Sequence, residues 1–144
     1  MLRRLAIVAV LVAAIGVAFV TVASGAPRKV YVERDIVSQQ LAYRPHAIGL
    51  SADGTFAITG IRWQSYGGSA ARAKARAYVR GCTPDCAQGR VYRPRATLSL
   101  SALVPCRGVT IYSQLRYVLY GPLPAGFHRS GTESLRPLGE ENGC

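Results

Sequence analysis

The strongest constraint on the fold is a strict alternation of apolar and polar residues over positions 71–80. In an extended chain one face would carry Ala71, Ala73, Ala75, Ala77 and Val79, and the other Arg72, Lys74, Arg76, Tyr78 and Arg80. In a helix this order would scatter the charges around the circumference and leave no apolar stripe. Alanine and arginine favour helices, but the alternation predicts a β-strand.

Four other segments are typical of strands, namely residues 47–50, 55–63, 96–101 and 109–120. Asp53-Gly54 lies between the first two and predicts a β-hairpin. Turn residues separate the segments, and the chain lacks the spacing of alternating strands and helices. The sequence therefore predicts an all-β fold, a small antiparallel β-sandwich or barrel.

Residues 1–25 have the layout of a secretory signal peptide. Arg3 and Arg4 precede an uncharged apolar run over residues 5–20, and small residues follow. We predict cleavage after Gly25, because a cut one residue later would place Pro27 directly after the broken bond. The alternative is an uncleaved anchor, since the run is marginally long enough to span a bilayer. Either way we expect an N-terminal signal or anchor helix and a domain that is secreted or held at the cell envelope.

The remainder of the chain is long enough for one domain with one small core. It is too short for a doubly wound α/β enzyme or a barrel of eight βα units. We assign residues 26–120 to a β-domain. Residues 121–144 are rich in glycine, proline, serine and charge and have few apolar anchors, so we expect a mostly irregular tail.

Four cysteines in an exported chain indicate disulfides, and they are Cys82, Cys86, Cys106 and Cys144. We favour a Cys82–Cys86 pair that closes a turn, which leaves Cys106 to pair with Cys144 and fix the tail. The alternatives join Cys82 or Cys86 to Cys106. A redox pair is disfavoured because such pairs usually enclose two residues within a βα unit. A soft-metal site is disfavoured because only His46 and His128 could complete it, so we expect no metal.

Motifs for catalysis are missing from the sequence. It contains no Gly-x-Ser-x-Gly and no His-Glu-x-x-His, and its two histidines have no acidic residue close in sequence. Paired carboxylates of the glycosidase kind would have no motif to connect them. We therefore expect no catalytic residues and no cofactor, and we rank an enzyme of unknown chemistry last among the functions.

Aromatic side chains could form a platform for sugars, with Trp63, Tyr66, Tyr78, Tyr112, Tyr117 and Tyr120 as its members. Trp63 shares a strand face with Ile61, so we favour core packing for the indole. The tyrosines at 112 and 120 point away from the one at 117 on the last strand, so some should be exposed.

Three segments of this sequence resemble a type of small exported protein found in actinobacteria. They are Gly60-Ile-Arg-Trp63-Gln-Ser-Tyr66-Gly67-Gly68, Cys82-Thr-Pro-Asp-Cys86-Ala-Gln-Gly89, and Pro105-Cys106-Arg-Gly108 with the tyrosine-rich run after it. The resemblance covers roughly residues 51–120. It implies a secreted or cell-envelope β-domain and names no activity.

The basic side of residues 71–80 is the candidate binding site. Its members are Arg72, Lys74, Arg76 and Arg80, in a chain of net charge +11. Cations about 6.5–7 Å apart along a strand repel one another unless water, salt or an anion intervenes. Such a row either keeps an exposed strand soluble or binds repeated phosphates or carboxylates, which the arginine fork can grip.

These observations rank the possible functions. The leading hypothesis is a secreted or envelope-associated, non-enzymatic β-domain that binds acidic envelope polymer or lipid head groups through the basic strand face. The sequence holds no specific nucleic-acid motif. The alternative hypothesis is a secreted proteinaceous protease inhibitor, which the small size, the export signal and the cysteines would suit.

Overall fold

The computed structural model describes residues 29–136, which form nine strands and no helix. In chain order the strands are β1 (Val30–Glu33), β2 (Leu41–Ala42), β3 (Ala47–Gly49), β4 (Phe56–Ser65), β5 (Ala71–Arg80), β6 (Val91–Tyr92), β7 (Arg95–Cys106), β8 (Val109–Tyr120) and β9 (Ser130–Ser134). The all-β prediction is confirmed. The predicted leader over residues 1–25 lies outside the described residues. Nothing between residues 29 and 136 is a helix long and apolar enough to cross a membrane.

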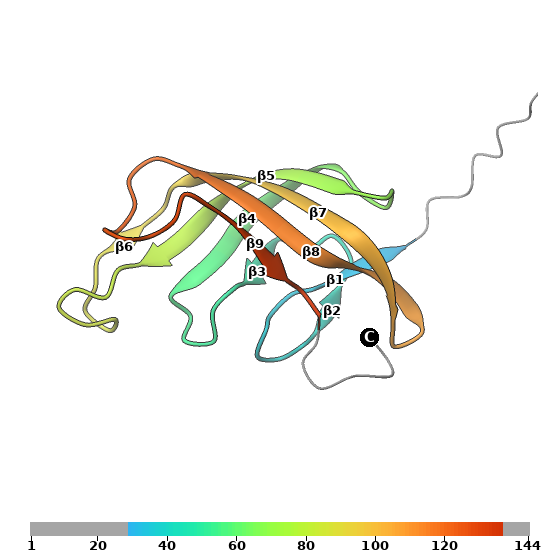
Figure 1. Ribbon diagram of the computed structural model, residues 1–144, viewed down its shortest axis with the longest axis horizontal. Coiled ribbons are helices and arrows are strands. Elements are labelled where there is room, and N and C mark those ends of the chain that lie inside the picture. Colours follow the sequence, from blue (N-terminus) through green and yellow to red (C-terminus); the bar gives the residue numbers. More distant parts are fainter. Residues whose placement is uncertain (1–28, 137–144) are drawn as a thin grey trace, which may run out of the picture.

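The strands form one sheet in the order β2-β1-β8-β7-β5-β4-β3, with β6 beside β5 and β9 beside β8. Figure 1 shows the long strands arching over the short strands β1, β2 and β3. The Gly49 N–H donates a 2.9 Å hydrogen bond to the Arg34 carbonyl, and Asp35 and Gly49 form a parallel bridge. The end of β1 therefore meets β3, and the sheet curls into a half-barrel.

The prediction of purely antiparallel pairing is wrong at β1. This strand runs parallel to β8, with Val30 opposite Thr110 and Val32 opposite Tyr112. The sheet is therefore mixed, and it curls on itself instead of forming a sandwich of two sheets. Alternation reveals which face of a strand is buried, but it carries no information about the direction in which that strand meets its neighbour.

The strand predicted over residues 71–80 is confirmed as β5, which lies inside the sheet between β7 and β4. Its alanines face the inside of the curl, where small side chains leave room for larger ones from neighbouring strands. The inward residues form one apolar core that includes Val32, Ile48, Ile58, Ala73, Ala77, Leu98, Leu100, Tyr112, Leu115 and Leu119. The opposite face of β5 consequently points to solvent.

The hairpin predicted at Asp53-Gly54 is also confirmed, since β3 and β4 pair antiparallel around it. The Asp53 carboxylate accepts hydrogen bonds from the Thr55 N–H (3.0 Å) and hydroxyl (2.7 Å). Gly54 has a φ of 71°, which a residue with a Cβ rarely adopts. Local side-chain bonds and a glycine therefore fix this turn.

The segment after residue 120 contributes a strand that the sequence did not indicate. β9 pairs antiparallel with β8, and the Leu135 N–H donates to the Ser113 carbonyl. The Leu135 side chain is fully buried. This part of the chain, although rich in glycine and serine, is therefore attached to the sheet.

The predicted Cys82–Cys86 disulfide is present and closes the turn between β5 and β6. Cys106 is disulfide-bonded as well. Its predicted partner Cys144 lies outside the described residues. A disulfide is compatible with an extracellular protein.

Candidate functional site

Three of the four predicted site residues lie together on the outer face of β5. Arg72, Lys74 and Arg76 are exposed and alternate with the buried alanines. Neighbouring strands flank them on both sides: Arg72 lies opposite Ser65 on β4 and opposite Ser99 on β7. The alternation in the sequence thus becomes a row of cations on the convex side of the half-barrel.

Strand pairing adds further cations to this row. Arg62 on β4 lies opposite Lys74, and Arg95 on β7 lies opposite Arg76. Arg116 on β8 lies opposite Ser99, which itself lies opposite Arg72. Residues directly opposite each other share a face of the sheet. We call this surface the outer basic face, and it comprises Arg62, Arg72, Lys74, Arg76, Arg95 and Arg116, all exposed.

The charges of the outer basic face are not neutralised within the part of the chain that the structure describes. None of its side chains makes an ion pair or a side-chain hydrogen bond there. Like charges placed directly opposite on neighbouring strands destabilise a sheet, and two such pairs occur here, Arg62 with Lys74 and Arg76 with Arg95. The face is therefore suited to an external anion.

Arg80, the fourth predicted residue, lies apart from this face. Its guanidinium donates to the Tyr78 hydroxyl through Nε (3.0 Å) and Nη2 (2.7 Å), and to the Ala87 carbonyl through Nη1 (2.8 Å). The Arg93 guanidinium lies over the same tyrosine ring, 5.4 Å from its centre. Arg80 thus ties β5 to the disulfide loop.

A β-bulge in β4 interrupts the face and hollows it. The pairing with β5 shifts register between Thr59 and Arg62, and Gly60 within the bulge has a φ of 59°. A Cβ at Gly60 would meet no atom within 4 Å. The resulting hollow is lined by Thr59, Gly60, Arg62, Lys74, Ala75, Arg76 and Arg95. The bulge therefore opens a cleft whose walls carry most of the cations.

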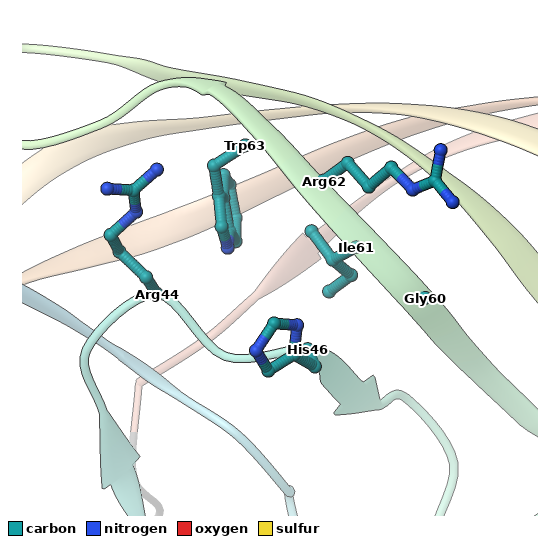
Figure 2. Close-up of a pocket in the computed structure, with 6 residues that line it drawn as sticks. All are labelled: Arg44, His46, Gly60, Ile61, Arg62 and Trp63. Atoms are coloured by element: carbon teal, nitrogen blue, oxygen red, sulfur yellow. The ribbon is translucent and has the colours of Figure 1, made fainter.

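A second hollow, of about 500 Å³, lies on the other side of Gly60 and is lined by Arg44, His46, Gly60, Ile61, Arg62 and Trp63. Figure 2 shows Arg44 beside the Trp63 indole and His46 below it, while Arg62 points away from them. The two hollows share Gly60 and Arg62. The sequence raised Trp63 as a member of a sugar platform and His46 as a metal ligand, but it did not bring these residues together, because the segment around residue 44 approaches β4 only in the folded chain.

We predicted core packing for Trp63. In the structure its side chain is half-buried and packs against the apolar core. Its Nε1–H donates a 3.0 Å hydrogen bond to the Pro45 carbonyl, and its ring packs edge-on against Tyr66. Tyr66 in turn contacts Tyr43 and Tyr112. Burial raises the pKa of Tyr66 to about 12, and the neighbouring main chain of Arg44 lowers this pKa by a smaller amount.

The two histidines lie in different parts of the described structure. His46 lines the second hollow, whereas His128 is exposed in the segment before β9. Within residues 29–136 no cluster of three or more histidine, cysteine, aspartate or glutamate side chains could hold a metal ion. Burial raises the pKa of Glu33, the one acidic side chain buried within these residues, and the charge of Arg107 partly offsets this effect.

Comparison of the chain with known protein families, with characterised proteins and with solved structures gives no match.

Proposed function

We propose that this protein is a non-enzymatic β-domain, secreted or held at the cell envelope, that binds an acidic polymer through the outer basic face. The observation that carries the proposal is the gathering of exposed cations from β4, β5, β7 and β8 on one side of the sheet. Most are arginines, whose planar fork can bind two oxygens of a carboxylate or phosphate at once.

The spacing of these cations suits a polymer with repeated charges. Along β5 they recur every second residue, at about 6.5–7 Å, and across the sheet the strands are about 4.8 Å apart. A chain of phosphates or carboxylates can therefore contact several cations in succession. Each exposed contact contributes little by itself, but the contributions accumulate along the row.

A polymer is favoured over a membrane surface by the placement of the apolar side chains. The exposed large hydrophobic residues in the described chain are Val37, Tyr43, Leu103 and Tyr120. Of these, Tyr120 lies directly opposite a cation of the outer basic face, Arg95. Peripheral membrane binding usually combines basic residues with apolar anchors, and the face offers few of these.

The test compares three proteins: the wild type, a face variant and a control variant of equal charge. The face variant carries Arg72→Gln, Lys74→Gln and Arg76→Gln, which keep most of the side-chain length. The control carries Arg34→Gln, Arg90→Gln and Arg129→Gln, which are exposed but lie elsewhere. The probes are polygalacturonate, inorganic polyphosphate and phosphatidylglycerol vesicles, each at low and physiological salt.

We expect the face variant to bind the soluble polymers about tenfold more weakly than the wild type at low salt, and the control to lose much less. Binding should weaken steeply as salt rises, because the Debye length falls to about 8 Å at physiological ionic strength. Equal affinities of the face variant and the control would contradict the proposal. Binding to vesicles alone would assign the face to a membrane surface instead.

A further inference from the structure

The hollow beside Trp63 has the features of a binding site for a single chemical unit. It lies along the part of β4 that follows Thr59, the partner of the first residue of β3, so β3 does not cover this stretch of the sheet edge. The Ile61 N–H donates to the His46 carbonyl, the last main-chain bond between the two segments before the hollow opens. Its volume of about 500 Å³ falls in the usual range of ligand sites, about 300–1,000 Å³.

The indole in this hollow is held in a fixed orientation. The hydrogen bond from Trp63 Nε1 to the Pro45 carbonyl restrains one edge of the ring, and the Tyr66 ring, 4.7 Å away between centres, restrains another. Ordered aromatic surface binds a ligand at a low entropic cost. A half-buried indole on the wall of a hollow is a suitable platform for the apolar face of a sugar ring.

Unused hydrogen-bond donors surround this platform. Among the described residues, the side chains of Arg44, His46 and Arg62 make no hydrogen bond or ion pair. Arg44 also has a φ of 50°, a left-handed conformation that is uncommon for a residue other than glycine, asparagine or aspartate. This backbone holds the arginine beside the indole (Figure 2), and such strain is frequent at ligand sites.

The hollow is continuous with the outer basic face. Gly60 and Arg62 line both it and the cleft of the bulge. In Figure 2 Arg62 points away from Trp63, and on β4 it lies opposite Lys74 of the face. A chain that lies along the face can therefore pass the bare backbone at Gly60 and place one of its units in the hollow.

We propose that this hollow binds one acidic sugar unit, so that the polymer is an anionic polysaccharide; this inference rests on the function proposed above. The sugar ring packs its C–H face against the Trp63 indole. Its carboxylate or phosphate accepts hydrogen bonds from Arg44, with His46 as a further polar contact. Arg62 binds the next acidic unit and leads the chain onto the outer basic face.

Trp63 itself provides the readout, because it is the single tryptophan of the sequence. A short oligomer of galacturonic acid should change its fluorescence in a saturable way. The fully methyl-esterified oligomer, which lacks the charge, should leave the emission unchanged. Inorganic polyphosphate, which lacks the sugar ring, should bind the face without changing the emission of Trp63.

Arg44→Asn removes the arginine beside the indole and leaves Arg62 in place, and asparagine tolerates the left-handed backbone. Arg107→Asn is the control for the loss of one cation at a left-handed position, because Arg107 is also an exposed arginine with a φ of 49°. It lies in the β7–β8 turn, where its Nη1 donates to the Gln39 carbonyl. We expect Arg44→Asn to weaken the fluorescence-detected binding of the oligomer about tenfold, the loss of a charge-assisted hydrogen bond. The control should stay within about twofold of the wild type.

The outcomes separate this inference from the proposed function. If calorimetry shows the oligomer binding while Trp63 emission is constant, or if the two asparagine variants bind equally, the hollow is not used and the face proposal stands. If polyphosphate changes the emission as the oligomer does, the site is not specific for sugars and the inference is wrong. If the face variant binds as the wild type does while Trp63 responds to the oligomer, the hollow is supported and the face is not.

Discussion

At the scale of single residues, Gly131 shows how closely one strand can approach an aromatic ring of the next. It lies opposite Tyr117 in the β8–β9 pair. A Cβ at this position would lie 2.5 Å from the Tyr117 hydroxyl oxygen and 2.7 Å from the ring carbon that bears it. The ring is buried, so it cannot move aside freely. An aromatic side chain that covers a cross-strand glycine is a known device for pinning register.

We predict that Gly131→Ala lowers the free energy of unfolding by about 1–3 kcal/mol, because the added methyl group overpacks a buried contact. Gly68→Ala is the control, since its Cβ would find its nearest neighbour, the Ala70 carbonyl oxygen, at 3.8 Å. Urea denaturation of both variants and the wild type measures the difference. Equal midpoints for all three would show that Tyr117 adapts without cost.

The sequence predicted part of the candidate site at this scale. Alternation alone placed Arg72, Lys74 and Arg76 on one exposed face, because a strand fixes which residues share a side. Arg62, Arg95 and Arg116 joined them only through strand pairing, and pairing register cannot be inferred from one strand. The bulge at Gly60 and the left-handed Arg44 depend on tertiary contacts, so the second hollow was not predictable.

At the scale of elements, the loop between β5 and β6 is closed by several kinds of interaction. The Cys82–Cys86 disulfide spans a sequence separation of only four. The Asp85 carboxylate accepts hydrogen bonds from the Ala87 and Gln88 N–H groups, both at 2.8 Å. At the base of the loop, the Gly81 N–H donates to the Arg90 carbonyl at 3.0 Å. The disulfide therefore adds to a turn that is already organised.

Replacing both cysteines, as Cys82→Ser with Cys86→Ser, should lower the free energy of unfolding by about 2 kcal/mol. The chain-entropy model gives a small value because the closed loop is short. The variant should keep the strand-type circular dichroism of the wild type, and chemical denaturation measures the loss. A variant without a folded sheet would show instead that this loop is required for β5 and β6 to pair.

Elements were predictable from the sequence where they were long enough to alternate. β4, β5, β7 and β8 each have ten residues or more. β2 and β6 have two residues each, and β9 consists mainly of serine and glycine, which have low strand propensity. These short strands form because the main chain of a longer neighbouring strand supplies the N–H and C=O groups with which they pair. The strand predicted over residues 96–101 extends to Cys106 in β7. The turn that follows has the left-handed pair Arg107–Gly108, whereas asparagine-glycine is the usual signal of a tight hairpin.

At the scale of the whole molecule, three tyrosines make the free energy of unfolding depend on pH in alkaline solution. Burial raises the pKa of Tyr66 to about 12 and also raises the pKa values of Tyr112 and Tyr117 above their ordinary value of 10.0. Each hydroxyl is therefore harder to ionise in the folded chain than in the unfolded chain. The stability that these groups contribute is fully present below pH 10 and is lost as the pH rises through the folded-state values.

We predict that the free energy of unfolding falls between about pH 10 and pH 12. Tyr66→Phe should reduce this fall, because it removes the ionising group whose hydroxyl is buried without a hydrogen-bond partner in the described structure. Tyr120→Phe, at a side chain that is 48% exposed, should leave the fall unchanged. Urea denaturation at a series of pH values distinguishes the two variants, and identical curves would contradict the prediction.

The parallel pairing of β1 with β8 determines the order in which the chain can fold. Val30, near the start of the described chain, has Thr110 as its partner. One edge of β1 can pair early with β2, but the other edge stays unpaired until β8 has emerged during synthesis. Contacts this far apart in sequence slow folding, because the intervening chain must be ordered before they form. The hairpins β3–β4 and β7–β8 are local and can form early. We infer that the pairing of β1 with β8 is a late step of folding. The sheet of the nascent chain therefore stays incomplete for most of its synthesis.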